Sequence, residues 1–117
     1  MSNSTQERLL DNVNRLVTAL RNVDNLGDYF GVPVEDAMDT LIESMLDTDY
    51  IYNSWGELQG AEIVMSFGGP TIWIETRYGK VCGRWDTEII DRQYHDGIGL
   101  DDLISELAPY KKENKNV

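Results

Sequence analysis

The stretch TIWIETRYGKVCGRW, residues 71–85, decides the fold class of this 117-residue chain. It consists of two runs rich in β-branched and aromatic residues, and the dipeptide Gly79-Lys80 between them is a turn signal. Successive side chains of a strand point to opposite faces, so Ile72 and Ile74 share one face and Trp73 takes the other. We therefore predict a β-hairpin whose isoleucine face packs on a core.

Strand signals continue on both sides of this hairpin. Residues 61–67 alternate in polarity, and a Gly-Gly-Pro turn at 68–70 separates them from the hairpin. Residues 88–94 have the composition of a further strand. We predict an antiparallel meander of three or four strands, with residues 47–60 as a loop before it.

Apolar residues at helical spacing predict three helices around this sheet. The first covers about residues 5–23, the second begins at Pro33 and ends near Leu46, and the third follows Gly99 and stops before Pro109. The segment between Leu26 and Phe30 is expected to form one short helical turn. The fold class is α+β, with two N-terminal helices, the meander and a C-terminal helix. Residues 1–110 form a single domain, and residues 111–117 form a basic polar tail.

The composition is strongly acidic, with 21 Asp and Glu against 10 Lys and Arg and a formal net charge of −11. This charge disfavours direct binding to nucleic acid or to an anionic membrane. No apolar run approaches the ~20 residues that span a bilayer, so no membrane association is expected. A lone cysteine, Cys82, cannot form an intrachain disulfide, which fits a reducing compartment. We expect a cytoplasmic protein whose partners are basic.

The acids are unevenly placed along the chain. The stretch from Asn22 to Thr76 has no Lys, Arg or His and contains eleven acids: Asp24, Asp28, Glu35, Asp36, Asp39, Glu43, Asp47, Asp49, Glu57, Glu62 and Glu75. Helical periodicity places Asp36, Asp39, Glu43 and Asp47 on one ridge of the second predicted helix, opposite its apolar stripe. Neighbours on such a ridge lie roughly 4 to 6 Å apart along the axis, of the order of phosphate spacing. The ridge is either an ordinary solvated helix face or a surface for a Lys/Arg-lined groove.

No catalytic or cofactor site emerges from the sequence. His95 is the only histidine, and no serine or cysteine stands in a nucleophile motif that would use it. One histidine and one cysteine exclude the usual zinc sites, and the Asp47-Thr48-Asp49 start of a calcium loop is not continued. We predict no enzyme activity, no metal and no cofactor.

Two aromatic side chains are candidate interface anchors. Trp73 lies opposite the isoleucine face of the predicted hairpin, and Tyr52 precedes the sheet. Exposed Trp and Tyr are frequent anchors at protein interfaces. The alternative is that a second core layer or the 47–60 loop covers them.

Two segments resemble known classes of protein. Residues 25–36, NLGDYFGVPVED, resemble the turn region of a helix-turn-helix regulator with Gly31 at the turn, but the following helix carries acids where that family contacts DNA. Residues 68–85, GGPTIWIETRYGKVCGRW, resemble small accessory proteins of phages and other mobile elements. That resemblance implies an inhibitor of host defence proteins, of the anti-CRISPR or antirestriction type, that imitates nucleic acid.

The sequence thus favours a non-enzymatic inhibitor that occupies the basic groove of a nucleic-acid-binding defence protein. The expected partner-binding residues are Asp36, Asp39, Glu43, Asp47, Asp49, Tyr52 and Trp73. The alternative is a regulatory or antitoxin-like protein that acts by protein contact or as a homodimer, through its apolar helix faces and its sheet edge.

Overall fold

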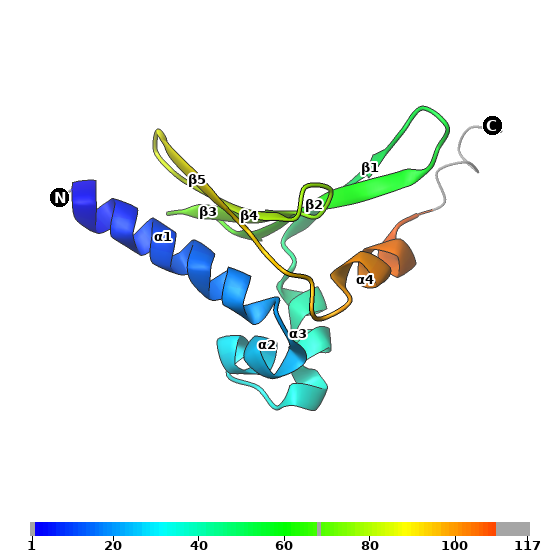
Figure 1. Cartoon of the computed structure of the whole chain (residues 1–117), viewed down its shortest axis with the longest axis horizontal. Helices are drawn as coiled ribbons and strands as arrows, with labels where there is room; N and C mark the ends of the chain where they lie inside the picture. Colours follow the sequence, from blue (N-terminus) through cyan, green and yellow to red (C-terminus); the bar gives the residue numbers. More distant parts are fainter. Residues whose placement is uncertain (1, 68, 110–117) are drawn as a thin grey trace.

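Five antiparallel strands lie side by side in chain order in the computed structural model, which describes residues 2–67 and 69–109. The strands are β1 (Asp47–Tyr52), β2 (Leu58–Ser66), β3 (Thr71–Glu75), β4 (Lys80–Trp85) and β5 (Glu88–Gln93). The helices are α1 (Ser2–Ala19), α2 (Val23–Phe30), α3 (Ala37–Ser44), preceded by the 3-10 turn η1 (Val34–Asp36), and α4 (Leu100–Leu107). All of the helices lie on one side of the sheet (Figure 1).

The predicted α+β class is confirmed, but the details of the elements differ. The sheet has five strands rather than three or four, because residues 47–52, expected in a loop, form β1. Its segment DTDYIY puts acids on one face and Thr48, Tyr50 and Tyr52 on the other, so the usual apolar alternation is missing. The predicted basic tail, residues 111–117, lies outside the described residues.

The helices also break at places that periodicity alone misses. The predicted 5–23 helix is α1, which ends at Ala19, and the expected short turn is the two-turn helix α2. Asn22 caps α2, because its Oδ1 accepts a hydrogen bond from the Asn25 backbone N–H at 2.8 Å. Gly31 ends α2 in the left-handed conformation, with φ 70°. A polar cap thus divides what the apolar pattern presents as one helix.

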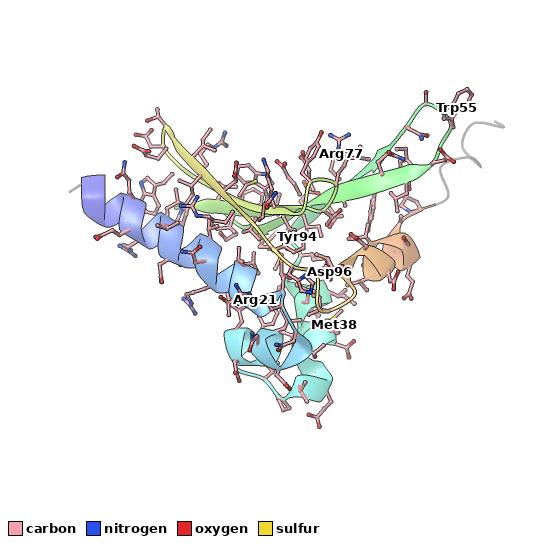
Figure 2. All side chains as sticks on the ribbon, viewed as in Figure 1. Arg21, Met38, Trp55, Arg77, Tyr94 and Asp96 are labelled. Atoms are coloured by element: carbon pink, nitrogen blue, oxygen red, sulfur yellow. The ribbon has the colours of Figure 1, made fainter. Side chains whose placement is uncertain are left out.

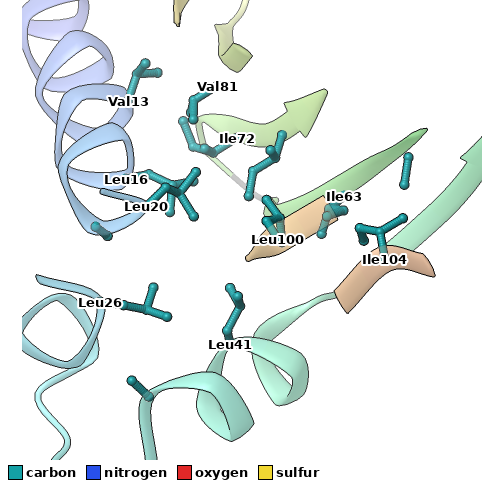
Figure 3. Close-up of a cluster of buried hydrophobic side chains, with 14 of the residues drawn as sticks. Val13, Leu16, Leu20, Leu26, Leu41, Ile63, Ile72, Val81, Leu100 and Ile104 are labelled. Carbon is teal, nitrogen blue, oxygen red and sulfur yellow. The ribbon is translucent and has the colours of Figure 1, made fainter. Parts of the chain in front are cut away.

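The core lies between α1 and the inner face of the sheet (Figure 3). Gly83 on β4 lets α1 approach closely, because an added Cβ would lie 2.8 Å from Val13 Cγ2 and 2.9 Å from Leu9 Cδ1. The side chains of Leu41 on α3 and Ile104 on α4 extend this core along the sheet. The helices therefore pack on one face of the sheet, α1 against β4 and β5 and α4 against β2.

Asp96 fixes the start of α4 in the connection that follows β5. Its Oδ1 accepts hydrogen bonds from the backbone N–H groups of Leu100 (2.8 Å) and Ile98 (3.3 Å), and its Oδ2 accepts one from Asp101 (3.1 Å). The bonds from Leu100 and Asp101 satisfy donors that the first turn of a helix leaves without intrahelical partners. The carboxylate also interacts favourably with the positive end of the helix dipole.

Replacing Asp96 with alanine should therefore destabilise the fold. We expect Asp96→Ala to lower the free energy of unfolding by about 1–2 kcal/mol, measured by urea denaturation. Asp102→Ala is the matched control, since it removes the same charge from the exposed first turn of α4 without removing these hydrogen bonds. Equal effects of the two substitutions would show that the hydrogen bonds of Asp96 contribute nothing.

Candidate binding face

One face of the sheet has no helix packed over it within the described chain (Figure 1). Strand register identifies the side chains on this side, because residues directly opposite each other share a face. We call it the uncovered face. It presents two cross-strand rows: Asp47, Val64, Trp73, Cys82 and Asp91, and beside it Asp49, Glu62, Glu75, Lys80 and Gln93.

The second row begins with three carboxylates on three adjacent strands. Asp49 on β1 is opposite Glu62 on β2, and Glu62 is opposite Glu75 on β3. We call these three residues the acid ladder. Neighbouring strands are about 4.8 Å apart, and like charges directly opposite each other destabilise a sheet. The fold therefore carries a local electrostatic cost at this place.

Within the described ranges, 2–67 and 69–109, Lys80 on β4 is the one basic side chain that strand pairing places opposite a member of the ladder, Glu75. The only ion pair within 4 Å there joins Lys80 and Asp91 at 3.9 Å, on β4 and β5. No cation of the described chain therefore lies within 4 Å of a carboxylate of the acid ladder. The uncovered face carries carboxylates on β1 to β3, the cations Lys80 and Arg84 on β4, and a further carboxylate, Asp91, on β5.

Trp73 occupies the middle of the uncovered face. Its neighbours in the row are Val64 on β2 and Cys82 on β4, and its indole Nε1–H donates a 2.9 Å hydrogen bond to Glu75 Oε2. The side chain is half-buried. The prediction that Trp73 lies opposite the isoleucine face is confirmed, because Ile72 and Ile74 are buried on the helix side.

The thiol of Cys82, next to Trp73, is held in its protonated form. Burial, the negative charges of Glu75 and Asp91, and a hydrogen bond from the thiol to Glu75 raise its pKa to about 12 from an ordinary value of 9.0. Only 5% of the residue is exposed. Cys82 is therefore a structural residue of the sheet and a poor nucleophile.

This pKa predicts a loss of stability at alkaline pH. The folded state keeps the Cys82 proton where the unfolded chain has released it, so the free energy of unfolding should fall from about pH 9 towards pH 12. Below about pH 9 the contribution is fully present. Urea denaturation at stepped pH should show a smaller alkaline decline in Cys82→Ser than in the wild type. Identical declines would contradict the raised pKa.

The predicted partner-binding residues do not form one surface. Asp36, Asp39 and Glu43 are exposed on η1 and α3, on the helix side of the sheet; we call these three the helix acids. The prediction that Asp47 continues their ridge is wrong, because α3 ends at Ser44 and Met45 is extended, with ψ 111°. Asp47 and Asp49 instead belong to β1 and to the uncovered face.

Tyr52 and Trp73 lie on opposite faces of the sheet. Strand pairing places Tyr52 opposite Leu58, whose side chain is not on the uncovered face. The Oη of Tyr52 donates a 2.6 Å hydrogen bond to the carbonyl oxygen of Pro109. Tyr52 therefore ties β1 to the segment after α4 on the helix side. The two aromatics cannot anchor the same flat partner surface.

The tip of the β1–β2 hairpin adds an aromatic residue that is not among the predicted partner-binding residues. Trp55 is 81% exposed at this tip (Figure 2). Asn53 orders the turn, because its Oδ1 accepts hydrogen bonds from the backbone N–H groups of Trp55 and Glu57, both at 2.9 Å. The signal in the sequence is Asn-Ser-Trp-Gly at 53–56, whose glycine takes φ 85°. Glu62 and Glu75 were also missed, because their alignment depends on strand register.

His95 is exposed after β5 and lines an open hollow with Val17, Arg21, Gln93 and Tyr94, a lining without carboxylates or thiols. Within residues 2–67 and 69–109 there is no group of three or more His, Cys, Asp or Glu that could hold a metal ion. No helix of the described chain is long and apolar enough to cross a membrane.

Comparison with known proteins adds no family assignment. The chain matches no protein-family model, no curated protein and no solved structure. The inference of function therefore depends on the geometry of the uncovered face.

Proposed function

We propose that this protein is a non-enzymatic inhibitor that docks its uncovered face on the basic groove of a nucleic-acid-binding protein, of the kind used in host defence. The observation that carries the proposal is the acid ladder, Asp49, Glu62 and Glu75, on a sheet face that no helix of the described residues covers. Asp47 and Trp73 in the neighbouring row extend the same surface.

Electrostatics supports this use of the face. Two like charges at about 4 Å repel by about 1 kcal/mol in water and by more near a protein surface, so the ladder opposes folding unless cations approach it. Lys and Arg side chains that bind phosphates are such cations. The ladder spacing of about 4.8 Å is of the order of phosphate spacing along a nucleic-acid strand. A groove that binds nucleic acid can therefore accept the ladder in its place.

Charge also indicates the kind of partner. The net charge of −11 repels nucleic acid and anionic lipid, whereas it accelerates encounter with a basic protein at low salt. Trp73 supplies apolar contact area within the acidic surface, as interface anchors do. A basic protein groove with an apolar floor satisfies both features.

Competition with nucleic acid tests the proposal. Immobilised protein should capture basic nucleic-acid-binding proteins from a bacterial lysate at about 50 mM salt and release them at about 200 mM. Added duplex DNA should release the same proteins at low salt, because both ligands need one groove. Capture that resists both salt and DNA would contradict the proposal.

Trp55 provides a separate prediction about the same interface. The side chain is almost fully exposed, so Trp55→Ala should change the free energy of unfolding by less than about 0.5 kcal/mol. As an aromatic anchor at an ordered hairpin tip, it should contribute to affinity, and its loss should weaken capture about tenfold. Quantitative binding and urea denaturation of the same variant check both parts. Unchanged affinity would remove the hairpin tip from the interface.

A further inference from the structure

The edge of β5 has the properties of a pairing site for another strand. β5 pairs with β4 along one edge and forms the end of the sheet, so its other edge has no strand partner within the described chain. Nearly all of its residues are exposed, including Ile89 at 63%. Such an edge presents backbone donors and acceptors to any extended segment that fits it.

The side chains of β5 fit a second copy of the same strand. We propose that the protein forms a homodimer in which two β5 strands pair antiparallel about a two-fold axis at Ile90. In this register Ile90 is opposite Ile90 of the second copy, and Glu88 is opposite Arg92 in both directions. Glu88, Ile90 and Arg92 share one face, because they are opposite Trp85, Gly83 and Val81 of β4. Opposite charges directly across a strand pair stabilise it.

Moving the two-fold axis to another residue of β5 removes this match. A two-fold axis that keeps both copies in one continuous sheet must pass through a residue of β5, since paired residues share a face. With the axis at Arg92, two arginines face each other, and with the axis at Asp91, two aspartates do. The Ile90 register leaves no like charges directly opposite within β5.

The other edge of the sheet is protected against such pairing. β1 carries Asp47 and Asp49 and no basic residue, and its pairing with β2 is irregular between Ile51 and Tyr52. Charged side chains and bulges are common protections of edge strands. Only the β5 edge therefore combines exposure with self-complementary charges in the described sheet.

Glu88 can make the new contact without losing its present one. Its Oε1 accepts a 2.7 Å hydrogen bond from Gln6 Nε2 on α1. A carboxylate has acceptor sites for several donors, so it can also accept from a guanidinium. Arg92 is exposed and has no carboxylate within 4 Å in the described chain; its Nη1 donates to the neighbouring carbonyl oxygen of Asp91 at 2.7 Å.

This arrangement has a consequence for the shape of the assembly. A two-fold axis perpendicular to the sheet keeps the uncovered faces of both copies on the same side. The dimer would then carry two acid ladders on one continuous ten-stranded surface. The dimer proposal is argued from β5 alone, so its test is independent of the test of the proposed function.

Charge exchange at β5 tests the dimer. Wild-type protein should sediment as a dimer in analytical ultracentrifugation at about 150 mM salt, where its net charge is largely screened. Glu88→Arg and Arg92→Glu should each weaken dimerisation by about tenfold or more, because each places like charges opposite each other twice. The double variant, Glu88→Arg with Arg92→Glu, should restore it. Glu106→Arg on the exposed side of α4 is the matched control and should leave the dimer unchanged.

The rescue distinguishes specific pairing from misfolding. Circular dichroism of each single variant checks that the fold persists, and recovery in the double variant cannot arise from two unfolding changes. A monomeric wild type at high concentration would overturn the proposal. A dimer that both single variants leave intact, or that the double variant fails to restore, would also overturn it.

Discussion

Gly97→Ala is expected to lower the free energy of unfolding by about 3 kcal/mol or more, a large effect for the addition of one methyl group. Gly97 lies in the connection between β5 and α4, and its N–H donates a 2.9 Å hydrogen bond to the carbonyl oxygen of Leu20. A Cβ at Gly97 would overlap the backbone carbonyl of Arg21. No side-chain rotation relieves an overlap with backbone, so the connection must move away from the end of α1.

That movement would separate two parts of the core. The connection after β5 leads into α4, whose Leu100 and Ile104 are buried against the sheet. Urea denaturation with a circular dichroism readout measures the effect. Gly99→Ala is the matched control in the same connection, because Gly99 has φ 78° but open space around its Cβ position. It should cost only about 1 kcal/mol for the left-handed backbone. Equal losses would show that the close approach at Gly97 is not limiting.

The elements that could be predicted from sequence are those in which one local pattern decides the structure. The hairpin of β3 and β4 follows from β-branched alternation and a glycine turn, and α4 follows from an apolar stripe that ends before Pro109. β1 was missed because its inward side chains are threonine and tyrosine, which are not apolar in a simple pattern. The split between α1 and α2 depends on the Asn22 cap, a single polar contact within an apolar repeat.

The candidate site was less accessible to sequence reasoning, since it depends on register. Helical periodicity grouped Asp47 with the helix acids, but the chain becomes extended at Met45 and moves Asp47 to the sheet. Glu62 and Glu75 lie thirteen positions apart and become neighbours only through the pairing of β2 with β3. Face assignment in strands alternates with each residue, so Tyr52 could be placed only once the pairing of β1 with β2 was known.

Neutralising three acids of the uncovered face together should weaken partner binding about a hundredfold at low salt. The variant is Asp47→Asn, Asp49→Asn and Glu62→Gln together, and the estimate takes about 1 kcal/mol for each lost carboxylate–cation contact. The matched control neutralises the helix acids with Asp36→Asn, Asp39→Asn and Glu43→Gln. Both variants change the net charge equally, so long-range attraction falls equally, and the control should lose no more than about threefold. Titration of a partner captured in the competition experiment measures both.

In the variant of the uncovered face, the free energy of unfolding should rise while the affinity for the partner falls. Removing the like charges opposite each other at Asp49 and Glu62 should raise the free energy of unfolding by about 0.5 kcal/mol, whereas the helix acids are not aligned across strands. A surface that weakens its own fold yet strengthens binding is expected of a functional site. Equal losses of affinity in the two variants would mean that total charge governs binding. A larger loss in the helix-acid variant would move the interface to η1 and α3 and remove the uncovered face from the mechanism.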